Sequence, residues 1–136
     1  RALREHIFKL PEARQTLEGI THPAIRQALI QQLQAAQSPY AILVSPLLFE
    51  TNQHELAQHT LLVDTSEDIQ IMRACARDQQ SEEQIRQIIA AQMPRSQKQT
   101  LAHDIVTNDG HLEHLYAQLQ PLHQLYLIKA EKLKAD

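Results

Sequence analysis

Residues 61 to 78 read LLVDTSEDIQIMRACARD and join an apolar run to a helical pattern. The run LLVDT has the continuous apolar character typical of a strand that is covered on both faces of a sheet. Ser66 then follows as a helix N-cap, and two acidic residues occupy the first turn, where the positive end of the helix dipole favours them. The stretch therefore predicts a buried strand followed directly by a helix over residues 66 to 78.

Two further apolar runs repeat this pattern, AILVS at residues 41 to 45 and the weaker DIVT at residues 104 to 107. Pro46 follows AILVS directly, and we expect it to mark the carboxyl end of a strand because proline cannot donate to a ladder. Helical patterns separate the runs, so the sequence predicts an α/β fold with a thin parallel sheet of three strands.

The predicted helices are bounded by recognisable signals. Pro11 separates two short helices, and Thr21-His22-Pro23 opens a longer one with proline at its first position. Ser81 and Gln84 form a capping-box pattern ahead of another helix. The expected helices span residues 2–9, 11–18, 21–37, 66–78, 81–93 and 111–134, the last with a kink at Pro121.

The composition excludes several classes of protein. The chain has 136 residues, 43% hydrophobic and 21% charged, and a net charge of -3, which gives no basic surface for nucleic acid. No apolar run approaches the roughly 20 residues that span a bilayer, and the charged N-terminus lacks the apolar region of a signal peptide. Cys75 is the single cysteine, so an intrachain disulfide is impossible. We expect a cytoplasmic protein that binds neither nucleic acid nor membrane.

In open α/β sheets, ligands bind beyond the carboxyl ends of the strands. Polar residues follow each apolar run, at Pro46–Glu50, at Asp64–Ser66 and at Asn108–Gly110. The convergence of these three segments predicts a ligand site at one edge of the sheet.

Two pairs of basic residues are candidates for binding an anion. Arg73 and Arg77 are four residues apart on one helix face, where like charges repel, and guanidinium groups suit bidentate phosphate contacts. Arg95 and Lys98 follow the helix of residues 81–93 and have the polar character of a lid. The alternative for the first pair is a solvated face that pairs with nearby acids, and for the second a solvated connection.

A metal site is not expected. His111 and His114 are three residues apart with His103 upstream, but no HExxH motif or cysteine pair accompanies them, so surface histidines are the simpler interpretation. Cys75 lies beside the arginines, a setting that suits a reactive thiol, yet a small core residue is the simpler interpretation for it too.

Six stretches, taken together and in their order, resemble the dephospho-CoA kinase family of P-loop small-molecule kinases. The resemblance implies a P-loop kinase-like parallel sheet with flanking helices and a small lid. It also implies transfer of the γ-phosphoryl group of ATP, with Mg²⁺, to the 3′-hydroxyl of dephospho-CoA in the last step of coenzyme A synthesis. The matching stretches are RALREHIF, THPAI, PLLFE, LLVDTSEDIQIMRACARD, SEEQIRQIIAAQM and AHDIVTNDG.

The resemblance assigns roles to individual residues and regions. It divides a single unit into a helical CoA-side region at residues 1–38, a core at 39–80 and 101–136, and a lid at 81–100. Arg73 is the catalytic arginine near the transferred phosphate, and Gln92 belongs to the lid. The phosphate and ATP residues are Arg77, Arg95, Lys98, Asn108 and Gly110, and the acceptor side comprises Arg4, His22, Pro23, Pro46, Leu47 and Glu50.

The sequence departs from the family pattern in ways that bear on activity. The only glycines are Gly19 and Gly110, so the 136 residues contain no GxxxxGK[ST] phosphate loop, and the Asp-x-Asp stretch with the catalytic base is also absent. Val44 and His103 stand where many members have an acid. Because the chain begins RALRE, we expect the C-terminal part of a larger protein, and we expect this chain alone to be inactive, to bind ATP poorly and to self-associate through an exposed sheet edge.

Two other functions remain open from the sequence. Another P-loop nucleotide or small-molecule kinase shares helix-borne arginines and a lid, although PLLFE and AHDIVTNDG argue against it. A non-catalytic interaction or regulatory module would use the helices for protein contacts, and the absent phosphate loop favours it.

Overall fold

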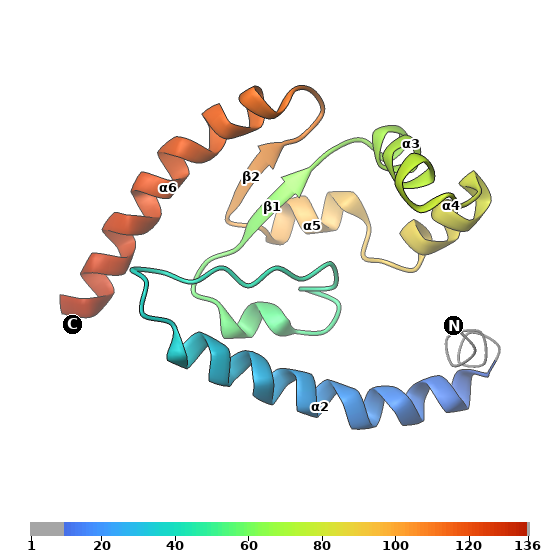
Figure 1. Cartoon of the computed structure of the whole chain (residues 1–136), viewed down its shortest axis with the longest axis horizontal. Helices are drawn as coiled ribbons and strands as arrows, with labels where there is room; N and C mark the ends of the chain where they lie inside the picture. Colours follow the sequence, from blue (N-terminus) through green and yellow to red (C-terminus); the bar gives the residue numbers. More distant parts are fainter. Residues whose placement is uncertain (1–9, 136) are drawn as a thin grey trace. The chain divides into compact units, whose positions relative to one another are not determined.

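The computed structural model describes residues 10 to 135, which belong to two compact units, Arg1–Ala41 and Ile42–Asp136. The predicted helix at residues 2–9, like Arg4, lies outside the described residues. Helices outnumber strands along the chain (Figure 1). The elements are α2 (Pro11–Ala35), the 3-10 helix η1 (Gln53–Leu56), β1 (Leu61–Asp64), α3 (Glu67–Asp78), α4 (Glu82–Ala90), α5 (Arg95–Leu101), β2 (Asp104–Thr107) and α6 (Leu112–Ala135).

The first unit contains one long helix where the sequence predicted two. Pro11 begins α2 as expected, but Pro23 lies inside the helix instead of opening a second one. The Thr21 hydroxyl donates to the Leu17 carbonyl at 2.9 Å within the helix, so it does not serve as a cap. Gly19, four residues before Pro23, has no side chain, and a Cβ built there would meet nothing within 4 Å.

The second unit is built on a parallel sheet, as predicted. β1 and β2 pair in parallel from Leu61↔Asp104 to Asp64↔Thr107. The N–H of Asp104 donates to the Thr60 carbonyl at 3.1 Å. Because backbone groups alternate between the two sides of a strand, those of Val63 face the other edge of β1, where no described residue pairs with them.

The outer edge of β2 is capped at one residue, Thr107, by a side chain from α6. The Thr107 N–H donates to Gln118 Oε1 at 2.9 Å, and Gln118 Nε2 donates to the Thr107 carbonyl at 3.0 Å. The glutamine amide thus takes the place of a third strand at this position. The two edges of the sheet therefore differ at their carboxyl ends, since a side chain caps β2 at Thr107 and none caps β1 in the described part of the chain.

The prediction of a strand at residues 41–45 is wrong. These residues form no ladder in the structure, and the side chains of Ile42 and Val44 are 75% and 86% exposed. An apolar run becomes a strand only where a neighbouring strand satisfies its backbone, and no described residue does so here. Pro46 does end the run, because residues 46–52 form turns in which the Thr51 N–H donates to the Leu47 carbonyl at 3.1 Å.

Helices α3 and α4 form where their caps predicted them. The Ser66 hydroxyl accepts from the Ile69 N–H at 3.4 Å, and Ser81 and Gln84 make both bonds of a capping box. The small core of the second unit includes buried Ile71 on α3, Ile85 on α4 and Val106 on β2.

The remaining helices complete the second unit. The segment predicted as a lid contains a helix of its own, since α5 begins directly after Pro94. α6 runs along the side of β2 (Figure 1) and contains Pro121, whose predicted kink stays a prediction. No helix in the described range 10–135 is both long and apolar enough to cross a membrane.

Candidate functional site

Two of the three predicted polar segments meet at the carboxyl ends of the strands. Asp64 is the last residue of β1, and its carbonyl accepts from the N–H of Asn108, just beyond β2, at 2.7 Å. The register of the sheet makes this contact, because Asp64 lies beside Thr107. The third segment, Pro46–Glu50, lies outside the ladder in the turns after residue 45.

Asp64 holds Arg95 in a bidentate ion pair. Arg95 Nε and Nη2 donate to the two carboxylate oxygens of Asp64, each at 2.8 Å. Gln99, one turn further along α5, donates its amide to Asp64 Oδ2 at 2.8 Å. Asp64 is only 7% exposed, so the start of α5 is tied to the end of β1 by three hydrogen bonds to one buried carboxylate.

The environment keeps this carboxylate ionised. The pKa of Asp64 lies below its ordinary value, mainly because of the hydrogen bonds from Arg95, although burial alone would raise it. Gln99 and the Thr65 N–H add to the lowering. Asp64 in turn raises the pKa of Arg95, so both groups stay charged at neutral pH.

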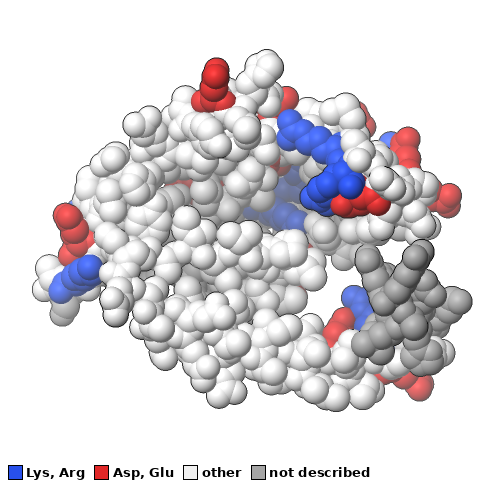
Figure 2. Space-filling model, viewed as in Figure 1, with Lys and Arg blue, Asp and Glu red and all other residues white. Residues whose placement is uncertain are grey.

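A second guanidinium reaches the same end of the sheet. Arg73 Nη1 on α3 donates to the Asn108 carbonyl at 2.6 Å. The N–H of the same Asn108 donates to the Asp64 carbonyl. The backbone of Asn108 therefore connects Arg73 on α3 to Asp64, the residue that binds Arg95. In the space-filling view, basic side chains gather beside α3 and α4, while few charged side chains show along α6 (Figure 2).

Two other predicted basic residues have local partners. Arg77 makes two bonds of 2.7 Å to Asp78, its neighbour on α3, and its side chain is 77% exposed, as the solvated-face alternative described. Lys98 donates to Gln92 Oε1 at 3.1 Å, within the segment predicted as a lid. A Cβ added at Gly110 would meet nothing within 4 Å, so the described residues give no steric reason for glycine there.

The predicted acceptor residues lie in both units. His22 and Pro23 are on α2 in the first unit, and Pro46, Leu47 and Glu50 are in the turns of the second. Both carboxylate oxygens of Glu50 and Nδ1 of His54 are buried without a hydrogen-bond partner among the described residues. The ring of His54 contacts that of Phe49, with centroids 5.3 Å apart. An unpaired buried carboxylate is costly, so Glu50 is a candidate for contact with a donor group outside the described residues.

The residues described do not fit a Mg²⁺ or zinc site. Residues 10–135 contain no group of three or more His, Cys, Asp and Glu side chains placed to hold a metal ion. The Asp64 carboxylate, the buried acid at the strand ends, already accepts from Arg95 and Gln99. His103 precedes β2 and contacts the Thr60 hydroxyl at 2.7 Å, whereas His111 follows β2 at its other end.

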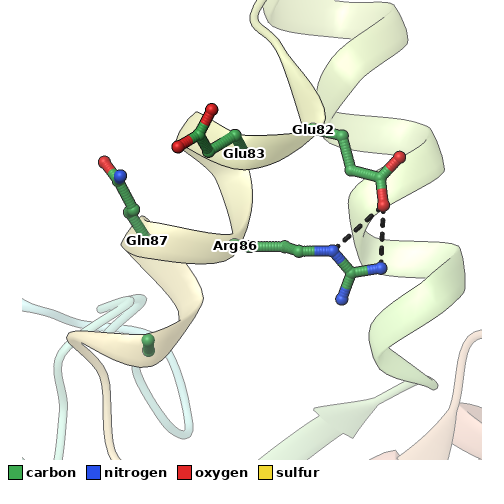
Figure 3. A pocket seen from close by; sticks show the side chains of 5 residues that line it. Glu82, Glu83, Arg86 and Gln87 are labelled. Carbon is green, nitrogen blue, oxygen red and sulfur yellow. Dashed lines mark hydrogen bonds and ion pairs between the residues drawn. The ribbon is translucent and has the colours of Figure 1, made fainter.

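A pocket on α4 lies apart from these contacts. Glu82, Glu83, Arg86, Gln87 and Ala90 line it, and Figure 3 shows Arg86 turned toward Glu82. Arg86 donates to Glu82 at 2.8 Å and to Glu67 on α3 at 3.2 Å. The pocket contains none of the predicted site residues and lies on one exposed helix face, so we place the site at the strand ends.

Sequence reasoning missed the residues that organise this site. Asp64 was noted only as part of a polar strand end, and Gln99 was not noted at all. The apolar run that ends in an acid was the available signal for Asp64, because a charge at the end of a buried strand requires a partner. Nothing in the spacing identified Arg95 as that partner, 31 residues away.

Comparisons with known proteins identify relatives of the chain. The family model described as dephospho-CoA kinase matches residues 1–114. A dephospho-CoA kinase of Acinetobacter baylyi is 68% identical over 127 residues, which are 93% of this chain and 65% of that protein. One of Hahella chejuensis is 47% identical over 130 residues, 96% of this chain and 62% of that protein.

A solved structure agrees with these matches. The crystal structure of TT1252 from Thermus thermophilus is similar with a TM-score of 0.79 at 33% identity, over 91% of this chain and 65% of that one. The chain therefore spans a little under two thirds of the length of the relatives and of the solved structure that it matches.

Proposed function

The chain belongs to the dephospho-CoA kinase family, and we propose that the protein carrying it transfers the γ-phosphoryl group of ATP to the 3′-hydroxyl of dephospho-CoA. The observation that carries the proposal is the pair of guanidinium groups, Arg73 and Arg95, held at the carboxyl ends of β1 and β2. Ligands of open α/β sheets bind at this edge.

The two arginines supply what phosphoryl transfer requires of a protein. The reaction needs its groups positioned and the charge on the phosphoryl oxygens neutralised, with little covalent help. Arg73 would contact the transferred phosphate as the catalytic residue, and Arg95 the neighbouring phosphates. Asn108 holds Arg73 by its carbonyl and joins it to β1, which fixes the arginine's direction before substrate binds.

The other predicted nucleotide residues have weaker support. Arg77 and Lys98 would have to leave Asp78 and Gln92 before they met a phosphate. Asn108 and Gly110 would lie near the adenine, as the resemblance to the family implies. Mg²⁺ would arrive bound to the phosphates of ATP, because the described residues provide no set of carboxylates for it.

On the acceptor side, the orphaned carboxylate of Glu50 supports the proposal most directly. A hydroxyl or amide of dephospho-CoA would satisfy oxygens that have no partner among the described residues. The turn that carries Glu50 is closed by the bond from the Thr51 N–H to the Leu47 carbonyl, and Pro46 directly precedes it. Arg4, His22 and Pro23 complete the proposed acceptor side.

We propose that the reaction takes place in the cytoplasm, because a free thiol such as that of Cys75 persists there. The 136-residue chain alone is proposed to be inactive, because it contains no phosphate loop. It is also proposed to self-associate through the open edge of β1.

A coupled assay of ADP release tests the proposal. The full-length natural protein should release ADP with dephospho-CoA as acceptor and at least about tenfold more slowly with nucleoside monophosphates, a difference of about 1.4 kcal/mol. Faster turnover of a nucleoside monophosphate would indicate a nucleotide kinase instead. If no acceptor is turned over, the remaining interpretation is a non-catalytic interaction module. The 136-residue chain should be silent in the same assay, and micromolar ATP affinity in calorimetry would contradict the proposed location of the phosphate site.

A further inference from the structure

Asp64 occupies an unusual position for an acidic residue near a proposed phosphate site. It is 7% exposed, and its two oxygens accept three side-chain hydrogen bonds from α5. A carboxylate beside phosphates repels them, so its presence calls for a role that offsets this repulsion. The role is visible in what it does to Arg95.

The ion pair leaves one edge of the Arg95 guanidinium unused. A guanidinium has five N–H donors in a rigid fork, and Asp64 takes one from Nε and one from Nη2. No hydrogen bond or ion pair engages Nη1 within the described part of the chain, and the Arg95 side chain is 49% exposed. One edge is therefore held by the protein, and the donors of Nη1 at the opposite edge are left for another partner.

The anchor itself is rigid. Asp64 ends β1, where the ladder with β2 holds its backbone, and its carbonyl accepts from the Asn108 N–H. Gln99 holds the carboxylate from the next turn of α5. Freezing a long arginine side chain before binding removes part of the entropy that the ligand would otherwise have to overcome.

The geometry points to Asp64 as the positioning residue for Arg95: it holds the Nε–Nη2 edge of the guanidinium so that Nη1 meets the phosphates of the bound nucleotide. This inference rests on the proposed function and deepens it, since it names the residue that prepares the nucleotide side of the site. The alternative role is that of a latch, which we define as an ion pair in which Asp64 keeps Arg95 from binding the phosphates. The two roles predict opposite changes in affinity when the carboxylate is removed.

Calorimetry on the full-length natural protein, with ATP and with dephospho-CoA as separate probes, tests the inference. Asp64→Asn should weaken ATP binding by about tenfold, since charged hydrogen bonds of this kind have that strength, and leave dephospho-CoA affinity within about twofold. Arg95→Ala should weaken ATP binding to a similar extent, and the double variant no further, because Asp64 acts through Arg95. Glu82→Gln, which breaks the exposed pair with Arg86 on α4, is the matched control and should change neither affinity.

Unchanged ATP binding by Asp64→Asn, or additive losses in the double variant, would overturn the inference. Tighter ATP binding by Asp64→Asn would overturn it and favour the latch. If Asp64→Asn does not fold, Arg95→Lys tests the same geometry. Lysine can pair with Asp64 but has no second edge to offer, so wild-type ATP affinity in Arg95→Lys would also overturn the inference. A wild-type protein that binds neither probe would instead overturn the proposed function, and the role of Asp64 with it.

Discussion

Arg73 is a single residue on which the proposed chemistry depends. Its guanidinium donates to the Asn108 carbonyl at 2.6 Å, so it is held at the strand ends by a neutral partner, and its charge is not cancelled by that contact. Arg77, one turn away on the same helix, is instead paired with Asp78. The sequence made both arginines equal candidates for binding an anion. Of the two, only the charge of Arg73 is not paired with an acid among the described residues.

Replacing Arg73 should therefore slow phosphoryl transfer. In the full-length natural protein, Arg73→Ala should lower kcat/KM by at least about tenfold, or about 1.4 kcal/mol of transition-state stabilisation. Arg86→Ala is the control, because it removes an arginine whose partners are Glu82 and Glu67 on exposed helix faces. Turnover by Arg73→Ala equal to that of the control would contradict the catalytic role.

At the scale of whole elements, caps and apolar runs carried most of what the sequence could predict. Ser66 and Ser81 predicted the starts of α3 and α4, because a helix cap is recognised from a few neighbouring residues. Both serines make the predicted cap bonds. Residues 41–45 failed because a strand is defined by its partner, which local sequence cannot reveal. The site followed the same rule: the strand ends were predictable, whereas the Asp64–Arg95 pair depends on a contact across 31 residues.

The attachment of α6 to the sheet depends on a polar cluster at the opposite end of the strands. The Tyr126 hydroxyl on α6 donates to Asp104 Oδ2 at 2.7 Å, and His59 Nε2 contacts the same oxygen at 2.6 Å. Lys129 Nζ lies 3.3 Å from Nδ1 of His59, and the His103 ring stacks on the His59 ring with centroids 4.5 Å apart. Burial alone would raise the pKa of Asp104, but the hydrogen bonds from Tyr126 and His59 outweigh it, and the pKa is lowered.

This cluster predicts how the stability of the fold responds to pH. A carboxyl with a lowered pKa in the folded state stabilises it above the unfolded pKa of about 3.9, and this contribution is lost as the pH falls through the folded value. Tyr126→Phe should lower the free energy of unfolding at pH 7 by about 1–2 kcal/mol and flatten its decline below about pH 4. Tyr116→Phe is the control, since Tyr116 is 60% exposed.

Urea titrations from pH 7 down to about pH 3 measure both effects. A Tyr126→Phe protein that loses stability on acidification as steeply as wild type would show that the hydroxyl does not hold Asp104 ionised. Asp64 titrates in the same direction, because its pKa is also lowered. The comparison between the two tyrosine variants, with Asp64 intact in both, isolates the part that belongs to α6.

At the scale of the whole molecule, the proposed self-association depends on a difference between the two edges of the sheet. On β2, the Gln118 amide occupies the backbone groups of Thr107. On β1, the outward backbone groups of Val63 have no partner among residues 10–135, and the Val63 side chain is 52% exposed. An open edge with apolar side chains is a template for pairing with another strand.

The 136-residue chain should therefore associate through β1 as its concentration rises. Sedimentation velocity should show a sedimentation coefficient that increases with concentration, and Val63→Lys should abolish the increase, because a charge on an edge strand opposes pairing. Ile105→Lys is the matched control, since Ile105 is 44% exposed on the strand whose outer edge Gln118 caps at Thr107, and it should associate like wild type. A wild-type chain that stays monomeric at the highest concentration, or a Val63→Lys chain that associates equally well, would show that the β1 edge is not the surface of contact.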